Sequence, residues 1–208
     1  AVLSVLYLIF NEGYTATCGD SLQRLDLCHE AIRLCRMLVQ LMGCESFLAR
    51  NPEAPGLLAL LILHHSRRRA RADEAGNLIL LAEQDRTLWM QDEISEGVAL
   101  LETALRMKRI GPYQLQAAIA AVHAQARRPA DTDWPQIVAL YDLLGRMSDN
   151  PMVALNRAIA VAMVEGPAAG LKLIEPLDHD ARIAGHYRLD AVRGHLYERT
   201  GDRTAAIR

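Results

Sequence analysis

The sequence is poor in aromatic residues, which make up 5% of the chain, and phenylalanine occurs only twice. Hydrophobic residues nevertheless account for 51% of the 208 positions, which suffices for a sizeable core. With so few rings, that core must consist mainly of Leu, Ala, Ile and Val, as in stacked helices. A chain of this length forms one large domain or two small ones.

The chain also lacks an excess of charge of either sign. Its 23 Lys and Arg residues nearly balance 25 Asp and Glu residues, for a formal net charge of −2. No global field attracts nucleic acid, so we expect this chain not to bind promoter DNA.

Long apolar runs are missing as well. No run approaches the roughly 18 residues of a membrane span, so we expect a soluble, cytoplasmic protein with no membrane partner. The opening segment 1–6 is apolar but has neither an initiator Met nor a basic flank. It therefore argues against a signal peptide and for a chain cut from a longer one.

Four cysteines are present, and none belongs to a close-spaced pair motif. Cys28 and Cys35 are seven residues apart on an expected helix, which separates their Cα atoms by roughly 10 Å. A disulfide requires less than about 7 Å. We therefore expect free, buried or half-buried thiols, and neither a metal nor a cofactor.

No known catalytic pattern occurs: there is no zinc-protease histidine pair, phosphate loop or nucleophile elbow. His29 and Cys35 are six residues apart on a helix and point to different sides. His123 lies on an alanine-rich helix, where a hydrogen-bonded core histidine is the favoured interpretation. The sequence predicts no enzyme active site.

A helical period of apolar residues runs through nearly the whole chain, and no alternating strand pattern of useful length occurs. The sequence therefore predicts an all-α fold of about ten helices, arranged as hairpins in a tetratricopeptide-like array. The first helix is expected to end at Phe10, where Asn11, Glu12 and Gly13 stop it and Gly13 adopts the positive φ of a C-terminal cap. Further helices are expected over 22–42, from Pro52 through 57–63, over 91–107 and 112–126, after Asp133, and over 151–165 behind Asn150.

The stretch 57–63 contains no polar residue and is expected to be buried on most sides. It leads into Arg67, Arg68, Arg69 and Arg71. Four arginines resemble a phosphate-binding patch, but cations also stabilise a helix C-terminus. Solvated or ion-paired arginines are therefore the favoured interpretation.

The last third carries a repeat signature. Gly194, Tyr197, Gly201 and Ala206 have the spacing of small, aromatic, turn and small positions in a tetratricopeptide repeat. Gly166 precedes Gly201 by 35 residues, close to the period of about 34. We interpret 1–208 as a single helical domain, with an N-terminal bundle part (1–110) and a tetratricopeptide-like part (111–208).

Several motifs recur in the order of a known family. The most specific is the segment 7–14, Tyr-Leu-Ile-Phe-Asn-Glu-Gly-Tyr, in which a carboxylate and two tyrosines surround a glycine. Others are 30–34, 56–60, 84–86 with Trp89, 111–123, 132–134 and 155–158. Together they resemble the C-terminal extension of a subgroup of extracytoplasmic-function (ECF) sigma factors, in which a tetratricopeptide-like domain follows the DNA- and polymerase-binding regions.

The resemblance implies a regulatory domain that acts in transcription initiation. Its expected partners are sigma regions 2 and 4 of the full-length protein, which this chain lacks, and RNA polymerase through that protein. Two alternatives remain open: a free-standing helical-repeat scaffold that binds peptides, and a small-molecule sensor with a pocket between the hairpin layers.

Polar residues that interrupt or end apolar helices are the candidate interaction site. For Asp85, Arg86 and Trp89, the favoured interpretation is an internal ion pair beside a packed indole. A buried arginine at position 157 would need a carboxylate partner. We expect Glu12 or Asp85 to lie within ion-pair distance of Arg86 or Arg157. The candidate cluster consists of Asn11, Glu12, Tyr14, Asp85, Arg86, Tyr113, Gln116, His123 and Arg157.

Overall fold

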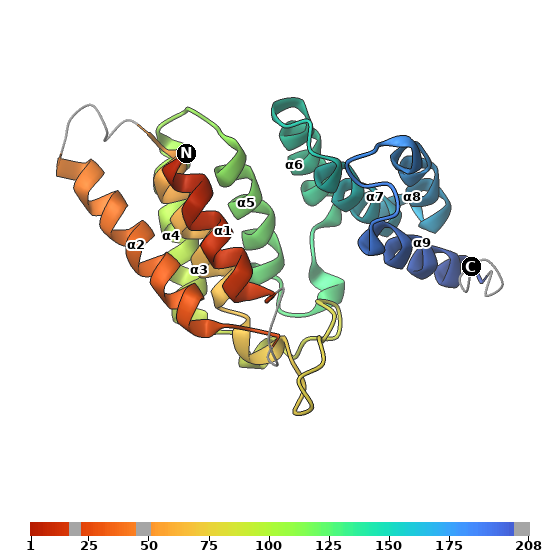
Figure 1. Ribbon diagram of the computed structural model, residues 1–208, viewed down its shortest axis with the longest axis horizontal. Coiled ribbons are helices and arrows are strands. Elements are labelled where there is room, and N and C mark those ends of the chain that lie inside the picture. Colours follow the sequence, from red (N-terminus) through yellow and green to blue (C-terminus); the bar gives the residue numbers. More distant parts are fainter. Residues whose placement is uncertain (17–21, 45–50, 202–208) are drawn as a thin grey trace. The chain divides into compact units, whose positions relative to one another are not determined.

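The structure is a computed structural model that describes residues 1–16, 22–44 and 51–201 (Figure 1). Across these residues the chain is all-α, which confirms the predicted fold class, and its β pairing is limited to one isolated bridge between Ala72 and Leu78. The α-helices are α1 (Val2–Tyr14), α2 (Leu25–Cys44), α3 (Glu53–His65), α4 (Gln91–Arg106), α5 (Pro112–Gln125), α6 (Trp134–Met147), α7 (Pro151–Glu165), α8 (Pro167–Ile174) and α9 (Tyr187–Thr200).

The chain divides into two compact units, and each is described by itself. Unit 1 spans Ala1–Thr132 and unit 2 begins at Asp133. The boundary lies after α5, not after residue 110, because α5 packs on α3 and α4 of unit 1.

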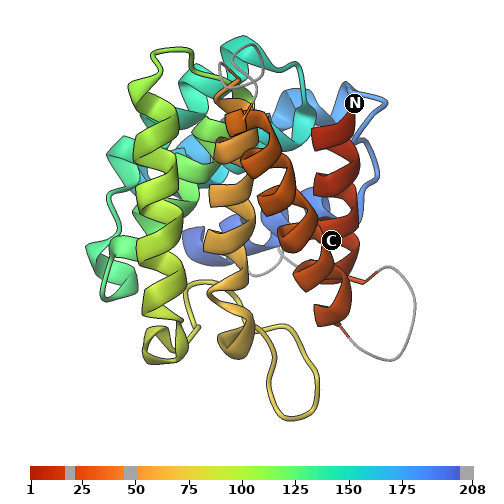
Figure 2. The same ribbon diagram turned by 90° about the vertical axis from the view of Figure 1, so that its left-hand side faces the viewer.

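Helix α3 is the centre of unit 1 and contacts α1, α2, α4 and α5 (Figures 1 and 2). Every residue from Leu57 to Leu63 is buried, as the uninterrupted apolar run predicted. Gly56 and Gly97 allow this close packing. A Cβ on Gly56 would lie 2.7 Å from the Gln114 side chain, and one on Gly97 would lie 2.7 Å from Leu63.

The first helix extends beyond its predicted end. Helix α1 continues to Tyr14, and Gly13 is a buried helical residue rather than a positive-φ cap. A Cβ at Gly13 would lie 2.7 Å from the Cys28 backbone nitrogen and 2.8 Å from the Arg24 carbonyl oxygen. The glycine is therefore needed for the close approach of α1 to α2, not for a turn.

Cys28 and Cys35 are free, buried thiols, as predicted. Burial raises the pKa of Cys28 to about 11 and that of Cys35 to about 12. Both are therefore protonated at neutral pH and behave as small apolar core residues. Cys18 lies outside the described residues.

Unit 2 is built on the pair α7 and α8, with α6 packed on α7 and α9 packed on α8. Gly170 of α8 fits against α7, since a Cβ there would lie 2.7 Å from the Ala162 side chain and 3.0 Å from the Ala158 carbonyl oxygen. Gly166 and Gly201 have φ values of 96° and 85° and end their helices, as turn glycines do.

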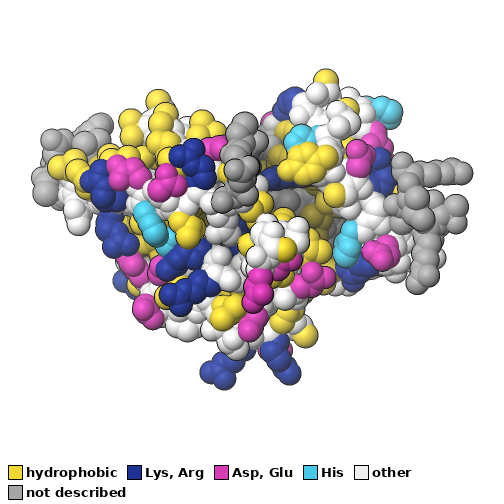
Figure 3. All heavy atoms as spheres, turned by 60° about the horizontal axis from the view of Figure 1, so that its bottom comes forward, with side chains coloured by type: hydrophobic (Ala, Val, Ile, Leu, Met, Phe, Trp, Pro, Cys, Tyr) yellow, Lys and Arg dark blue, Asp and Glu magenta, His cyan; other side chains and the backbone are white. Residues whose placement is uncertain are grey.

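The surface drawn in Figure 3 has mixed charge, with basic and acidic side chains interspersed over it. Across the described residues, no helix combines the length and the apolar character needed to cross a membrane.

Candidate functional site

Helix α5 is capped at its N-terminus by a side chain from another helix. The Glu53 carboxylate on α3 accepts hydrogen bonds from the backbone N–H groups of Tyr113 (3.0 Å) and Gln114 (3.3 Å). It occupies the space that a side chain at Gly111 would need, since a Cβ there would lie 2.3 Å from Glu53 Cδ. A negative charge also complements the positive end of the helix dipole.

The opposite end of α5 is closed by an arginine from the loop before α4. Arg86 donates to the carbonyl oxygens of His123 (2.8 Å) and Ala126 (2.6 Å) and lies over the Trp89 ring at 4.7 Å. These carbonyls have no acceptor role inside the helix, and a cation there complements the negative end of the dipole. Helix α5 is thus held between Glu53 and Arg86.

Helix α1 ends in a similar way. Arg71 is buried, donates to the Tyr14 carbonyl oxygen and to Thr15 Oγ1, and lies 3.3 Å from the centre of the Tyr14 ring. Arg67 donates to the Tyr14 hydroxyl at 2.7 Å and to His64 Nδ1 at 3.0 Å. The tyrosine that ends the most specific sequence motif is therefore fixed by two arginines.

This region concentrates positive charge. Across the described residues, no carboxylate lies within ion-pair distance of Arg67, Arg71 or Arg86. Burial, with Arg67 and Arg86 nearby, lowers the pKa of His123 to about 4, and burial with Arg67 and Arg71 lowers the pKa of His64 well below its usual value. Both histidines are neutral at pH 7.

A second polar contact lies between α3 and α4. Glu93 accepts from Arg68 at 2.8 and 2.9 Å and lies 3.0 Å from His65 Nδ1. The His29 ring lies edge-on to His65 at 4.9 Å. Burial lowers the pKa of His65. The four side chains join α2, α3, α4 and the segment that follows α3. Among the described residues, no set of three or more His, Cys, Asp or Glu side chains has a metal-binding arrangement.

The candidate cluster is not gathered as predicted. Asp85 caps the short helix that follows it, accepting from the Thr87 N–H at 2.9 Å, and Arg157 in unit 2 pairs with Asp142 at 2.5 Å. Across the described residues, no ion pair joins Asp85 to Arg86 or Arg157, so that predicted pairing is wrong. Glu12 is half-buried and does not pair with Arg86 either, since no described carboxylate lies within ion-pair distance of that arginine.

Other members of the predicted cluster lie on two facing helices. Tyr7 of α1 contacts the Tyr113 ring edge-on at 5.6 Å and donates to Gln116 Oε1 at 3.3 Å. Asn11 is exposed on α1. Tyr113 and Gln116 therefore join α5 to α1, while His123 contributes a carbonyl oxygen at the far end of α5.

The sequence did not point to Glu53, and it suggested one common role, solvated or ion-paired, for the four arginines between positions 67 and 71. The structure divides that stretch: Arg68 forms an ion pair, Arg71 caps α1, Arg67 contacts Tyr14, and Arg69 is exposed. The Gly111-Pro112 step was a signal for Glu53, because a glycine before a helix leaves room for a capping side chain from elsewhere.

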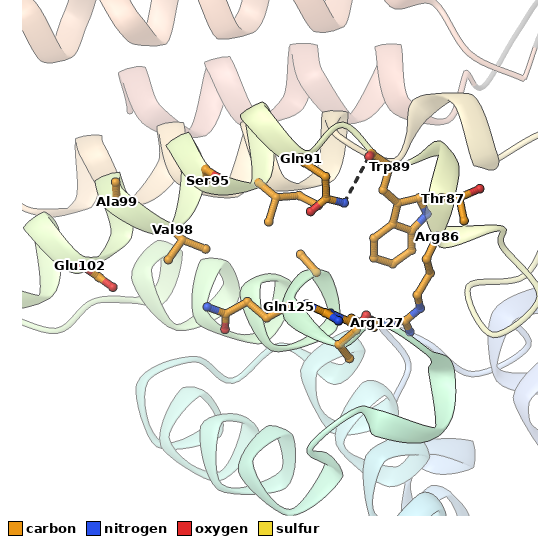
Figure 4. A pocket seen from close by; sticks show the side chains of 13 residues that line it. Arg86, Thr87, Trp89, Gln91, Ser95, Val98, Ala99, Glu102, Gln125 and Arg127 are labelled. Atoms are coloured by element: carbon orange, nitrogen blue, oxygen red, sulfur yellow. Dashed lines mark hydrogen bonds between the residues drawn. The ribbon is translucent and has the colours of Figure 1, made fainter.

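A groove of about 730 Å³ lies beside this region, between α4 and the C-terminal end of α5. One face of α4 forms its length, including Ser95, Val98 and Ala99, and Gln125 at the end of α5 lies across from them (Figure 4). Glu102 lies at one end, and Arg86 with Trp89 lies at the other.

Two comparisons with known proteins give matches. The family described as "Family of unknown function (DUF6596)" matches residues 1–105. "Uncharacterized protein R00370" of Rhizobium meliloti (strain 1021) is 48% identical over 201 residues, which is 97% of this chain and 46% of that protein. The chain thus spans less than half the length of this relative.

No solved structure matches. The family match covers 105 of the 208 residues and includes α1 to α4 almost completely. The chain therefore belongs to the family of unknown function DUF6596.

Proposed function

We propose that this chain is the regulatory C-terminal domain of an ECF-type sigma factor and acts in transcription initiation. The observation that carries the proposal is the asymmetry of coverage. A protein 48% identical to this chain is matched over 97% of the chain but over only 46% of its own length. The rest of that protein has ample room for sigma regions 2 and 4, and the motifs of this chain resemble the extension that follows those regions.

We assign the domain a binding role and not a catalytic one. Glu53, Arg71 and Arg86 hold helix ends, and Glu93 bridges α3 and α4. These side chains are engaged in the fold, whereas the groove between α4 and α5 offers a surface of mixed apolar and charged character. Such a surface suits a protein or peptide partner.

Regulation follows if the domain binds one state of the sigma core more tightly than another. A ligand or domain shifts a conformational equilibrium only by its difference in affinity for the two states. The proposed domain would hold the sigma regions in one arrangement and thereby set how much of the protein can engage promoter DNA.

Transcription with the purified full-length Rhizobium relative tests the proposal. The protein is mixed with core RNA polymerase and genomic DNA of its own organism, and transcript starts are mapped by sequencing. We expect it to co-purify with core polymerase and to produce a defined set of starts that are absent with core polymerase alone. Failure to bind core polymerase, or a set of starts no different from that of core polymerase, would overturn the proposal.

A further inference from the structure

The groove between α4 and α5 has the length and shape of a site for one helix. Its α4 face extends from Gln91 to Glu102, which is about 16 Å at 1.5 Å per residue, or about three helical turns. The central residues Ser95 and Ala99 are small and exposed, and Ala124 of α5 also lines the groove. Small side chains on both walls allow a helix to approach to the 8–10 Å interaxial distance of packed helices.

The two ends of the groove differ in charge. Arg127 and Arg86 lie toward one end. Arg127 is exposed, and across the described residues it has no ion-pair partner. The other end has Glu102, whose carboxylate is shared with Arg106 at 3.3 Å and is therefore partly neutralised. The arginine end has the stronger field.

Two buried donor atoms at the arginine end have no hydrogen-bond acceptor in the described part of the chain. Arg86 Nε and Trp89 Nε1 are buried, and neither has an acceptor among the residues that the structure describes. Both residues line the groove. The exposed cation at this end is Arg127, which lines the groove and can pair with an occupant that presents carbonyl or carboxylate oxygens. The C-terminus of a helix presents such oxygens together with a partial negative charge.

The geometry points to an amphipathic helix docked in this groove antiparallel to α4, with its C-terminal end at Arg127 and its N-terminal end at Glu102. Its apolar face would cover Val98 and Ala99, and an acidic side chain in its last turn would pair with Arg127. The inference rests on the proposed function for the source of the helix, which is the part of the full-length protein outside this chain. More than half of the Rhizobium relative lies outside the match.

Site-specific photocrosslinking in the full-length protein that contains this chain tests the inference. A photoreactive phenylalanine derivative replaces Gln125 at the groove wall, or Glu102 at its far end, in two separate variants. We expect crosslinks from both positions to one amphipathic helix outside residues 1–208. Position 125 should reach its C-terminal half and position 102 its N-terminal half. The same derivative at Leu105, which is exposed on α4 but outside the groove, serves as the control.

The charge at Arg127 gives an independent test. Arg127→Glu should reduce the crosslinking yield at position 125 at least about tenfold, because like charges then face each other, whereas Arg127→Lys should keep it. Arg127 is exposed, so circular dichroism should show both variants folded. Crosslinks to residues 133–208, to a second copy or to no protein segment would overturn the inference, and so would a reversed order of contacts.

The outcome separates this inference from the proposed function. Crosslinks to the expected helix in a protein that does not bind core polymerase would sustain the docked helix and reject the sigma-factor assignment. Promoter-dependent transcription by a protein that gives no such crosslinks would support the sigma-factor assignment and reject the docked helix. A small carboxylate ligand would appear as protection of position 125 from crosslinking on addition of cell extract depleted of protein, and this too would contradict a docked helix.

Discussion

The two units cap their helices by different means. In unit 1, α1 ends at Arg71, which is 57 residues away in sequence from Tyr14, and α5 is held between Glu53 and Arg86. In unit 2, α6 and α7 are capped by the residues immediately before them, Asp133 and Asn150. Unit 1 thus depends on long-range polar contacts that form only when the helices assemble, whereas the helix ends of unit 2 are set by local sequence.

The most buried arginine–carboxylate pair among the described residues lies in unit 1. Arg68 and Glu93 in unit 1 are mostly buried, with 17% and 24% of their side chains exposed. In unit 2, Arg182 bonds to Asp149 and Asp180 with about half of its side chain exposed. Exposed pairs contribute little to stability, so unit 2 must rely on its apolar core around Leu155, which small residues of α7 and α8 allow to close.

The largest effect should come from the core of unit 1. Leu61 is fully buried in α3, and Leu61→Ala should lower the free energy of unfolding by about 2–5 kcal/mol through lost burial and a cavity. Urea unfolding followed by tryptophan emission in a Trp134→Phe background reports on Trp89 and hence on unit 1 alone. Leu8→Ala, at a position 65% exposed on α1 of the same unit, should change the free energy of unfolding by less than about 0.5 kcal/mol. Equal effects of the two changes would contradict the structure.

Acid should destabilise unit 1 through two half-buried histidines, His123 and His64. The folded-state pKa of His123 is about 4, against a usual 6.5, so between these values the unfolded chain binds a proton that the folded chain does not. The contribution of His123 to the free energy of unfolding is complete above pH 6.5 and is lost as the pH falls toward 4. At 1.36 kcal/mol per pKa unit, the loss is about 3 kcal/mol. His64 acts in the same direction.

Unfolding midpoints of unit 1, measured from pH 4 to 7.5 with Trp89 emission, check this dependence. His123→Gln should flatten the curve between pH 4 and 6.5. His179→Gln, at an exposed site in unit 2, should leave it unchanged. A curve that keeps its slope in His123→Gln would show that other groups cause the acid sensitivity.

Removal of a long-range cap should lower the free energy of unfolding more than removal of a local cap. Arg86→Ala leaves the His123 and Ala126 carbonyls without their charged donor and should cost about 2 kcal/mol, with Arg86→Lys recovering less than half. Asp133→Ala removes only a local N-cap of α6, bonded to the Gln136 N–H at 2.9 Å, and should cost about 1 kcal/mol. Urea unfolding measures the free energy of unfolding of each variant, with Trp89 as the only tryptophan for Arg86→Ala and Trp134 as the only tryptophan for Asp133→Ala. A larger loss from Asp133→Ala than from Arg86→Ala would contradict the greater contribution of long-range caps.

The same contrast explains what could be predicted from the sequence. The caps at Asp133 and Asn150 and the turn glycines 166 and 201 were recognised correctly, because each acts within a few residues of its own position. The all-α class followed from the apolar period. These features depend on local physics that a linear sequence displays directly.

The candidate site in unit 1 could not be read in the same way. Asp85 and Arg86 were expected to share an ion pair, but Asp85 caps its own short helix and Arg86 turns to the end of α5. The local sequence does not distinguish an ion pair between these residues from two separate caps. The outcome depends on which helix end lies beside the segment of Asp85 and Arg86 in the folded protein. Gly13 was misread for the same reason: a glycine needed for close packing and one needed for a turn have the same letter.

The same substitution at two helical glycines, one in each unit, should change stability with opposite signs. Gly13→Ala places a Cβ within 2.7 Å of the Cys28 backbone nitrogen and 2.8 Å of the Arg24 carbonyl oxygen. Backbone atoms cannot rotate away as a side chain can, so α1 must shift from α2, at a cost of about 1–3 kcal/mol. Gly145→Ala meets nothing within 4 Å on α6 and removes the conformational entropy that glycine loses in a helix, which should stabilise unit 2 by about 0.5–1 kcal/mol. Urea unfolding through Trp89 for the first variant and Trp134 for the second measures both changes. If Gly13→Ala also stabilised its unit, Gly13 would be dispensable for the approach of α1 to α2, and the packing role that distinguishes it from Gly145 would be refuted.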